Sequence, residues 1–156
     1  ISMGGITALW LGINAAERFK TITVANSAAK IGQADAWLTR ADQVEKNGLD
    51  DLVKTTHTRW FSEKFDYQHN ALAQQTINSL ASTPAKGYAN ACRALAHADV
   101  RASLPELKIP ALLICGIQDP ITTVEDGEFI RSHVKNAELK SPAPAFICSG
   151  IVNLAT

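Results

Sequence analysis

The sequence has no excess of either charge and no long apolar run. Lysine plus arginine and aspartate plus glutamate each number 15 among 156 residues, so the formal net charge is zero at pH 7. A neutral chain lacks the positive surface that general binders of nucleic acid or of acidic membranes need. No stretch approaches the roughly 18–20 consecutive apolar residues of a membrane span. We therefore expect no nucleic-acid partner and no membrane partner.

Cysteine, proline and glycine are also scarce. The three cysteines (Cys92, Cys115 and Cys148) are widely spaced and odd in number, which fits neither a disulfide framework nor a zinc site. This pattern predicts a reducing, cytoplasmic location. Six prolines, nine glycines and 46% hydrophobic residues exclude a disordered chain. The length suffices for one globular domain with its own core.

The first residues, Ile1-Ser2-Met3, include neither an initiator methionine nor a signal-peptide pattern. We therefore predict that this start is a cut edge, with further sequence upstream.

Hydrophobic spacing predicts an α/β order of elements. Ile6, Leu9, Trp10 and Ile13 recur at helical intervals within a helix over residues 3–19. The β-branched segment 21–26 then predicts a strand. Further along, we expect an apolar strand over 111–115 that is covered on both faces, a helix over 124–134 capped by Thr122 or Thr123, and a short strand over 137–140.

Residues 30–98 contain no convincing strand. Their polar and aromatic residues follow helical spacing, interrupted at Asn47-Gly48 and at Pro84, and the last helix is expected over 87–101. A helical block between strands predicts an α/β core, with a mostly parallel sheet, that carries a helical insertion.

Ser2 opens the first predicted helix and precedes two glycines. In the nucleophile elbow, Gly-x-Ser-x-Gly, a serine sits on a strained strand-to-helix turn that requires small residues nearby. Gly4 occupies the later glycine position, and the backbone N–H of Met3 would be an oxyanion donor. The alternative is a serine that merely caps the helix.

Asp119 follows the apolar strand in Gly116-Ile117-Gln118-Asp119-Pro120. A carboxylate at the carboxyl edge of a parallel sheet is placed where such folds build their sites. It is suited to orient a histidine, as the acid of a Ser-Asp-His triad does. The order serine, then acid, agrees with that of α/β-hydrolases. The alternative is an ordinary Asp-Pro turn.

Several segments together resemble the 3-oxoadipate enol-lactonases, a family of α/β-hydrolases in aromatic catabolism. The resemblance covers residues 1 to about 145. Beside the Ser2 and Asp119 segments, it rests on Thr23-Val-Ala-Asn-Ser-Ala-Ala29, Arg59-Trp60-Phe61, Gly87-Tyr-Ala-Asn-Ala-Cys92, Ala98-Asp-Val-Arg101 and Ile109-Pro-Ala-Leu-Leu-Ile-Cys115. The Arg-Trp-Phe and Gly-Tyr-Ala segments are the more particular ones.

The resemblance implies a Ser-Asp-His hydrolase of a small lactone or ester that needs no metal or organic cofactor. Ser2 would be the nucleophile, Asp119 the acid and Met3 an oxyanion donor, and Arg59 and Trp60 would contact substrate. A guanidinium suits the substrate's carboxylate, although a solvated Arg59 beside a core Trp60 explains this pair equally well.

The family's histidine, which follows its last strand, is missing. The four histidines (His57, His69, His97 and His133) all precede that place, and we interpret them as surface or interface residues. After Ala145 the resemblance ends. Codons permitted for residues 145–151, read one base out of frame, encode His-Leu-Ser-Val-Val-Glu. This requires that Ala145 use one particular codon of the four for alanine. A one-base deletion or a sequencing slip would therefore explain the loss, and the encoding DNA would decide.

We therefore expect a partial α/β-hydrolase with core segments 1–29 and 99–145, a helical cap over 30–98 and an atypical, frameshifted tail over 146–156. The expected reaction is hydrolysis of 3-oxoadipate enol-lactone. A serine nucleophile leaves open a carboxylesterase, a perhydrolase or a carbon–carbon hydrolase. The chain is also consistent with a non-catalytic fragment, because it lacks the triad base.

Overall fold

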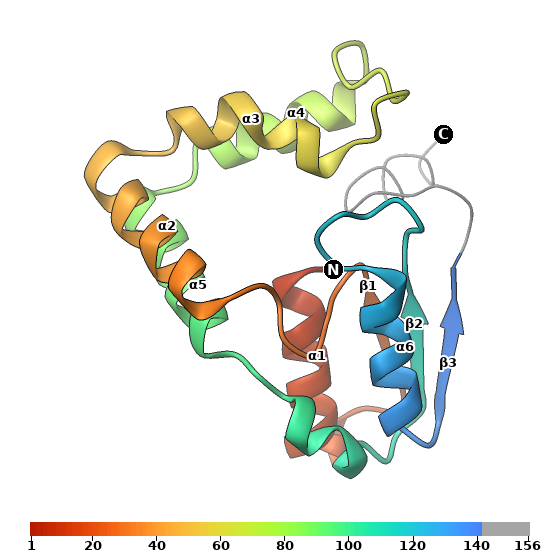
Figure 1. Ribbon diagram of the computed structural model, residues 1–156. Coiled ribbons are helices and arrows are strands. Elements are labelled where there is room, and N and C mark those ends of the chain that lie inside the picture. The colour runs from red at the N-terminus through yellow and green to blue at the C-terminus, as the bar shows by residue number, and fades with distance from the viewer. Residues whose placement is uncertain (142–156) are drawn as a thin grey trace. The chain divides into compact units, whose positions relative to one another are not determined.

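In the computed structural model, residues 1–141 are described, and they divide into two compact units. The sheet unit combines Ile1–Ile31 with the described residues from Ala98 onward, and the helical unit is the segment Gly32–His97. Figure 1 shows both along the chain. The predicted frameshifted tail lies outside the described residues. Within them, no helix is long and apolar enough to cross a membrane.

The sheet unit is built on three parallel strands in the order β1-β2-β3. Val24 of β1 is paired with Leu113 of β2, which is paired with Leu139 of β3. In chain order its elements are α1 (Met3–Asn14), η1 (Ala16–Arg18), β1 (Ile22–Ala25), η2 (Arg101–Glu106), β2 (Ala111–Ile114), α6 (Val124–His133) and β3 (Ala137–Lys140). All three predicted strands are therefore present.

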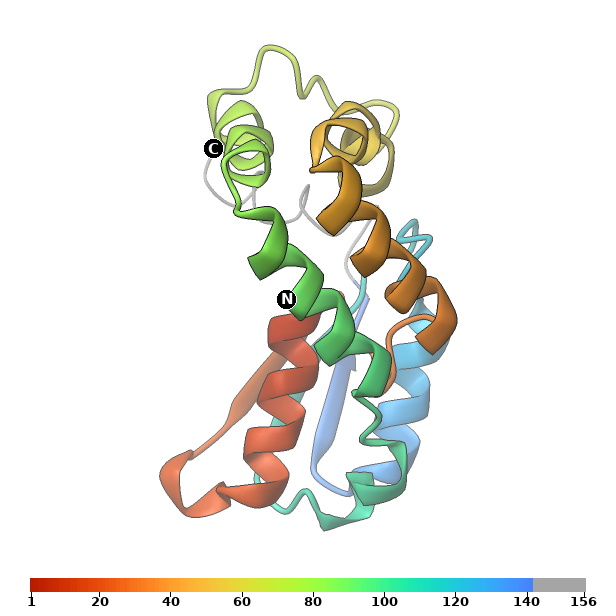
Figure 2. The same ribbon diagram turned by 90° about the vertical axis from the view of Figure 1, so that its left-hand side faces the viewer.

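Helices α1 and α6 cover the same face of this sheet (Figures 1 and 2). Alternate strand residues are buried on that face, including Ile22 and Leu113. Gly12 of α1 lies so close to Ile22, and Gly127 of α6 so close to Leu139, that a Cβ at either glycine would press on these side chains. The small residues of both helices therefore allow close packing on the strands.

The opposite face of the sheet differs from the prediction. The apolar run over 111–115 predicts a strand covered on both faces, but within residues 1–141 Leu112 and Ile114 are only half-buried. Thr23 and Glu138, their neighbours on this face, are exposed. The reason is that the described helices lie on the other face.

The helical unit contains α2 (Ala34–Asn47), α3 (Asp50–Trp60), α4 (Ala71–Ala81) and α5 (Ala85–His97). Helix α2 packs on α5 through Ala41, Ala89 and Cys92. The predicted interruptions are confirmed: Gly48 ends α2 with φ 78°, and Pro84 directly precedes α5.

Helix ends were predicted less accurately than helix positions. Helix α1 ends at Asn14 instead of residue 19, and Trp10, expected on its apolar face, is 53% exposed. Helix α5 ends at His97 instead of residue 101, because the Val100 N–H donates to the carbonyl of Ala29. The cap of α6 is confirmed: the Thr123 side chain accepts from the backbone of Asp126 in a reciprocal capping box.

Candidate active site

Ser2 lies at the start of α1 in a backbone conformation that few residues adopt. Its φ is 47° and its ψ is −124°, a strained region for any residue with a Cβ. Its side chain makes no capping hydrogen bond to the helix. The alternative of a simple N-cap serine is therefore not supported, because such a serine has an extended backbone and a bonded hydroxyl.

Met3 is the first residue of α1, so its backbone N–H has no acceptor within the helix. This donor and the positive end of the helix dipole lie directly beside Ser2, where an oxyanion would be stabilised. The hydroxyl of Ser27 donates to the carbonyl of Ser2 at 2.7 Å and so helps to hold the turn at Ser2 in place.

Asn26 connects Ser2 to Asp119. It follows β1, and its carbonyl accepts the Ser2 N–H at 2.9 Å. Its side-chain Nδ2 donates to Oδ2 of Asp119 at 2.8 Å. The two predicted catalytic residues are therefore held by one buried residue, through its backbone carbonyl and its side chain, at the carboxyl edge of the sheet, the end at which Figure 1 marks the N-terminus.

Asp119 is almost completely buried, with 4% of its surface exposed. Oδ1 accepts the backbone N–H groups of Ile121 at 2.8 Å and Thr122 at 3.0 Å. Oδ2 accepts from Asn26 and from the Thr122 hydroxyl at 3.1 Å. The loop after β2 thus holds a carboxylate in one orientation, with hydrogen bonds compensating its loss of water.

Large apolar residues stand close to Ser2 and Asp119 in the sequence, and their side chains are exposed. Seven large hydrophobic residues are exposed in the described part of the chain, and four of them flank the site: Ile1, Met3, Ile117 and Ile121. Exposed apolar groups gathered beside a buried carboxylate and a strained serine are typical of a ligand-binding surface.

No histidine donates to Asp119 within residues 1–141. His133, the last residue of α6, directs Nδ1 to the carbonyl of Phe129 at 2.8 Å. In the helical unit, His69 pairs with Asp66, and His57 stacks on Tyr67 with ring centroids 4.8 Å apart. The interpretation of the histidines as surface or interface residues stays a prediction.

Arg59 and Trp60 lie at the end of α3 in the helical unit, and both are half-buried. Trp60 packs against two apolar clusters of that unit. Burial lowers the pKa of Arg59, and the positive charge of Arg40 lowers it further. Because the sheet and helical units are described separately, the predicted substrate contact of these residues stays a prediction.

Metal ligands and reactive thiols are not found at this site. Within the described residues, no three His, Cys, Asp or Glu side chains are grouped as metal ligands. Cys115, which precedes the acid loop, is buried and unpaired, and burial raises its pKa to about 11. It is therefore a neutral thiol that packs against α6, not a nucleophile.

The sequence alone does not identify Asn26 as a site residue. The available signal was an asparagine at a strand end, since asparagine tolerates a positive φ better than most residues do. Asn26 has φ 42°. Neither of its contacts was predictable, because Asp119 is 93 positions away in the sequence.

We expect Asn26→Ala to lower the free energy of unfolding by about 2–4 kcal/mol, because it leaves a buried acceptor without its donor and because alanine tolerates positive φ less well than asparagine does. Asn26→Gly should lose about 1 kcal/mol less, since glycine accepts this φ. Urea unfolding measures both. Asn14→Ala, at an exposed helix end, is the control. Equal losses for the two Asn26 variants would show that the backbone is not strained there.

Comparison with known proteins agrees with this geometry. No protein-family model matches the sequence. The chain is 65% identical over 135 residues to 3-oxoadipate enol-lactonase 1 of Acinetobacter baylyi, covering 86% of this chain and 51% of the relative. It is 46% identical over 140 residues to 3-oxoadipate enol-lactonase 2 of the same organism, covering 90% and 52%.

Solved structures show the same fold. The enol-lactonase from Burkholderia xenovorans matches with a TM-score of 0.89 and 26% identity, over 99% of this chain and 62% of that one. A thermophilic esterase from Thermogutta terrifontis matches with a TM-score of 0.88 at 19% identity, over 99% and 58%, which supports the fold alone. The chain spans about half the length of the curated relatives it matches. The chain has part of the α/β-hydrolase fold, and its sequence is similar to those of the 3-oxoadipate enol-lactonases.

Proposed function

We propose that this chain supplies the nucleophile and the acid of a serine hydrolase that opens 3-oxoadipate enol-lactone. The observation that carries the proposal is the strained Ser2 at the start of α1, joined through Asn26 to the buried carboxylate of Asp119. Its similarity to enol-lactonases supports the choice of substrate. Simple esters are the second candidate substrate class, because an activated serine attacks their carbonyl in the same way.

In this mechanism the Ser2 hydroxyl attacks the lactone carbonyl, and the Met3 N–H donates to the oxyanion that forms. A histidine takes the serine proton and returns it to the enol oxygen as the ring opens. Water then hydrolyses the acyl-enzyme by the same route. The enol product tautomerises to the ketone, so the ring opening leaves one molecule and no separate leaving group.

All four histidines lie in the described part of the chain and none of them donates to Asp119, so we infer that none of the four is the base. We infer that a histidine base would take the position on Asp119 that the Thr122 hydroxyl now occupies. At 3.1 Å this is the longest of the four bonds to Asp119 and the only one from a freely rotating hydroxyl. If that hydroxyl turns away, Oδ2 can accept a histidine Nδ1–H.

The test is a chimera, in which this chain's matching segment replaces the corresponding segment of the Acinetobacter baylyi 3-oxoadipate enol-lactonase 1. We expect the chimera to hydrolyse enol-lactone, and the 156-residue chain alone to show no measurable turnover, because a missing triad base typically costs several orders of magnitude in rate. Assays with enol-lactone and with simple aryl esters separate the two substrate classes. A folded but inactive chimera would refute the proposal, as would a 156-residue chain whose activity requires Ser2.

We also propose that the tail after Ala145 arose from the one-base shift predicted above. Sequencing the encoding DNA is the measurement. A reading frame without the required Ala145 codon would contradict this origin, and the chimera assay does not depend on it.

A further inference from the structure

Ser27 donates one of three hydrogen bonds that the backbone carbonyl of Ser2 accepts. Its hydroxyl lies 2.7 Å from that carbonyl oxygen, and the N–H groups of Gly5 and Ile6, in the first turn of α1, donate at 2.8 and 3.3 Å. Ser27 follows β1 by two residues and is 2% exposed. Within residues 1–141, its bond is therefore the only one that ties this carbonyl to a part of the chain outside α1.

Gly5 leaves the space in which this hydroxyl lies. A Cβ at residue 5 would stand 2.6 Å from Oγ of Ser27, which is too close for a carbon and an oxygen that are not covalently joined. Helix α1 therefore lies directly against the side chain of Ser27, and this buried hydroxyl has the Ser2 carbonyl as its acceptor. We therefore expect any side chain at residue 5 to disturb this hydrogen bond.

The Met3 N–H is the one backbone donor of this turn for which no acceptor is found within residues 1–141. The N–H of Ser2 is bonded to the carbonyl of Asn26, and that of Gly4 to the carbonyl of Ile1, each at 2.9 Å. The Ser2 carbonyl and the Met3 N–H belong to the same peptide group, which is planar and places them on opposite sides. A bond that holds the carbonyl therefore also sets the direction in which the Met3 N–H points.

Ser27 fixes this peptide group relative to the acid, which the helix alone does not do. The other two donors to the Ser2 carbonyl belong to α1 itself, so their bonds are kept when the helix shifts as a whole. Ser27 belongs to the segment after β1, in which the preceding residue, Asn26, binds Asp119 at 2.8 Å. Two consecutive residues therefore hold the peptide group of the nucleophile and the carboxylate in one frame.

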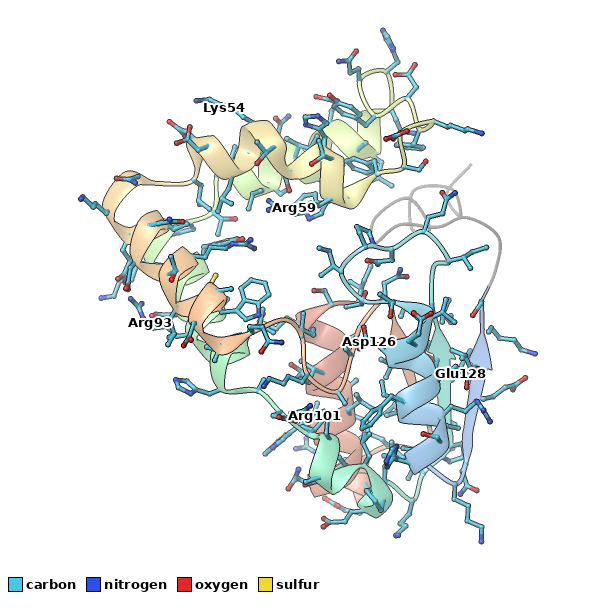
Figure 3. All side chains as sticks on the ribbon, in the orientation of Figure 1. Lys54, Arg59, Arg93, Arg101, Asp126 and Glu128 are labelled. Atoms are coloured by element: carbon cyan, nitrogen blue, oxygen red, sulfur yellow. The ribbon has the colours of Figure 1, made fainter. Side chains whose placement is uncertain are left out.

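Charged side chains take no part in holding the Ser2 carbonyl in the described part of the chain. The charged residues that Figure 3 labels in the sheet unit lie on η2 and α6, and they are Arg101, Asp126 and Glu128. Each of them is engaged elsewhere, in an ion pair or in the cap of α6. Neutral groups therefore hold and polarise this peptide group, so its orientation should not depend on ionic strength.

We propose that Ser27 is a positioning residue for the oxyanion donor of the reaction, an inference that rests on the proposed function. Its hydroxyl holds the peptide group between Ser2 and Met3 so that the Met3 N–H faces the oxygen on which negative charge develops. When Oγ of Ser2 bonds to the lactone carbonyl carbon, the π electron pair of that carbonyl moves onto its oxygen. The serine proton passes to the histidine in the same step.

The hydrogen bond from Ser27 gains strength during this step. As the Met3 N–H donates to the oxyanion, electron density in its peptide group shifts toward the Ser2 carbonyl oxygen. That oxygen becomes a stronger acceptor for the Ser27 hydroxyl, as in any chain of hydrogen bonds that polarise one another. An interaction that is stronger in the transition state than in the ground state raises kcat and leaves substrate affinity unchanged.

Ser27→Ala in the chimera tests this role, because alanine keeps Cβ and removes only the hydroxyl. We expect kcat to fall about tenfold and KM to change less than about twofold, since the lost bond is one that strengthens in the transition state. Inhibition by trifluoroacetophenone, whose ketone takes up the serine as a hemiketal oxyanion, should weaken about tenfold as well. Ser27→Cys has a weaker donor and should give intermediate losses, and it replaces the alanine variant if that one unfolds.

Thr7→Val is the matched control on the same helix. The Thr7 hydroxyl donates to the carbonyl of Met3 at 2.8 Å, which belongs to the next peptide group, whose N–H is the bonded one of Gly4. The variant therefore removes a similar bond without touching the oxyanion donor, and kcat should change less than about twofold. Circular dichroism establishes that each variant is folded.

Four results would each overturn the role of Ser27 in the folded chimera. They are an equal loss of kcat in Thr7→Val and Ser27→Ala, a loss confined to KM, an unchanged kcat in Ser27→Ala, and a lower kcat with unchanged inhibition by trifluoroacetophenone. The last of these would show that the hydroxyl supports the fold of the turn without acting on the oxyanion.

Nuclear magnetic resonance of the isotope-labelled chain separates this inference from the proposed function, because it requires no catalysis. Ser27→Ala should shift the amide signal of Met3, and Thr7→Val that of Gly4 instead, since losing a bond to a carbonyl changes the N–H of the same peptide group. A shifted Met3 signal with an inactive chimera would refute the hydrolase and keep Ser27 as the residue that sets the Met3 N–H. An unshifted Met3 signal with an active chimera would do the reverse.

Discussion

Replacing Ser2 by alanine in the chimera is expected to reduce enol-lactone turnover by about three to six orders of magnitude, the range found when a triad nucleophile is removed. The physical reason is that the Ser2 hydroxyl makes no helix-capping bond and is presented at the exposed start of α1. Initial rates at saturating lactone measure the effect. Ser132→Ala, a serine of α6 that bonds only to neighbouring residues, should leave the rate unchanged.

Stability measurements on the same serine distinguish an elbow from a helix cap. An N-cap serine loses about 1 kcal/mol on replacement by alanine. Ser2→Ala should instead change the free energy of unfolding by less than about 0.5 kcal/mol, because no capping bond is lost and the strain stays. Ser2→Gly should raise it by about 1 kcal/mol or more, since glycine relaxes φ 47°. A loss of about 1 kcal/mol for Ser2→Ala, with a loss of only a few tenths for Ser2→Gly, would identify Ser2 as a cap.

Asp119→Asn is expected to reduce turnover of the chimera by about 10³–10⁴-fold. The reason is that an amide no longer fixes the tautomer of the histidine or stabilises its protonated form. It should also lower the free energy of unfolding by about 1–3 kcal/mol, since its NH₂ group meets donors where a carboxylate accepted them. Asp119→Ala should destabilise more, because it leaves the donors of Asn26, Ile121 and Thr122 without their acceptor.

The control for Asp119 is Glu128→Gln, which removes an exposed carboxylate paired with Arg131 and should cost less than about 0.5 kcal/mol and no activity. Kinetics and urea unfolding are compared on the same samples. Loss of stability with full activity would assign Asp119 a purely structural role in the loop.

The fold was predictable, as were the places of Ser2 before a helix and of Asp119 after a strand, because their signals are local. The strand over 137–140 is read from four consecutive residues and is confirmed with the same bounds. Ser2 and Asp119 were identified by short motifs beside a helix and a strand. What was missed depends on contacts distant in sequence: the bond from Asn26 to Asp119, the end of α5 set by Val100 and Ala29, and the uncovered side of Leu112.

The antiparallel packing of α2 on α5 bears on how the sheet assembles. β1 and β2 pair Ile22 with Ala111, although the whole helical unit lies between them in the chain. Bringing distant residues together costs entropy that grows with the length of the intervening loop. Once α2 and α5 pack along their lengths, the start of α2 and the end of α5 lie at the same end of the pair. The loop that remains to be closed is short, and the hydrogen bond from the Val100 N–H to the Ala29 carbonyl joins the segments that lead into and out of the helical unit. The packed insertion therefore lowers the entropic cost of pairing β1 with β2.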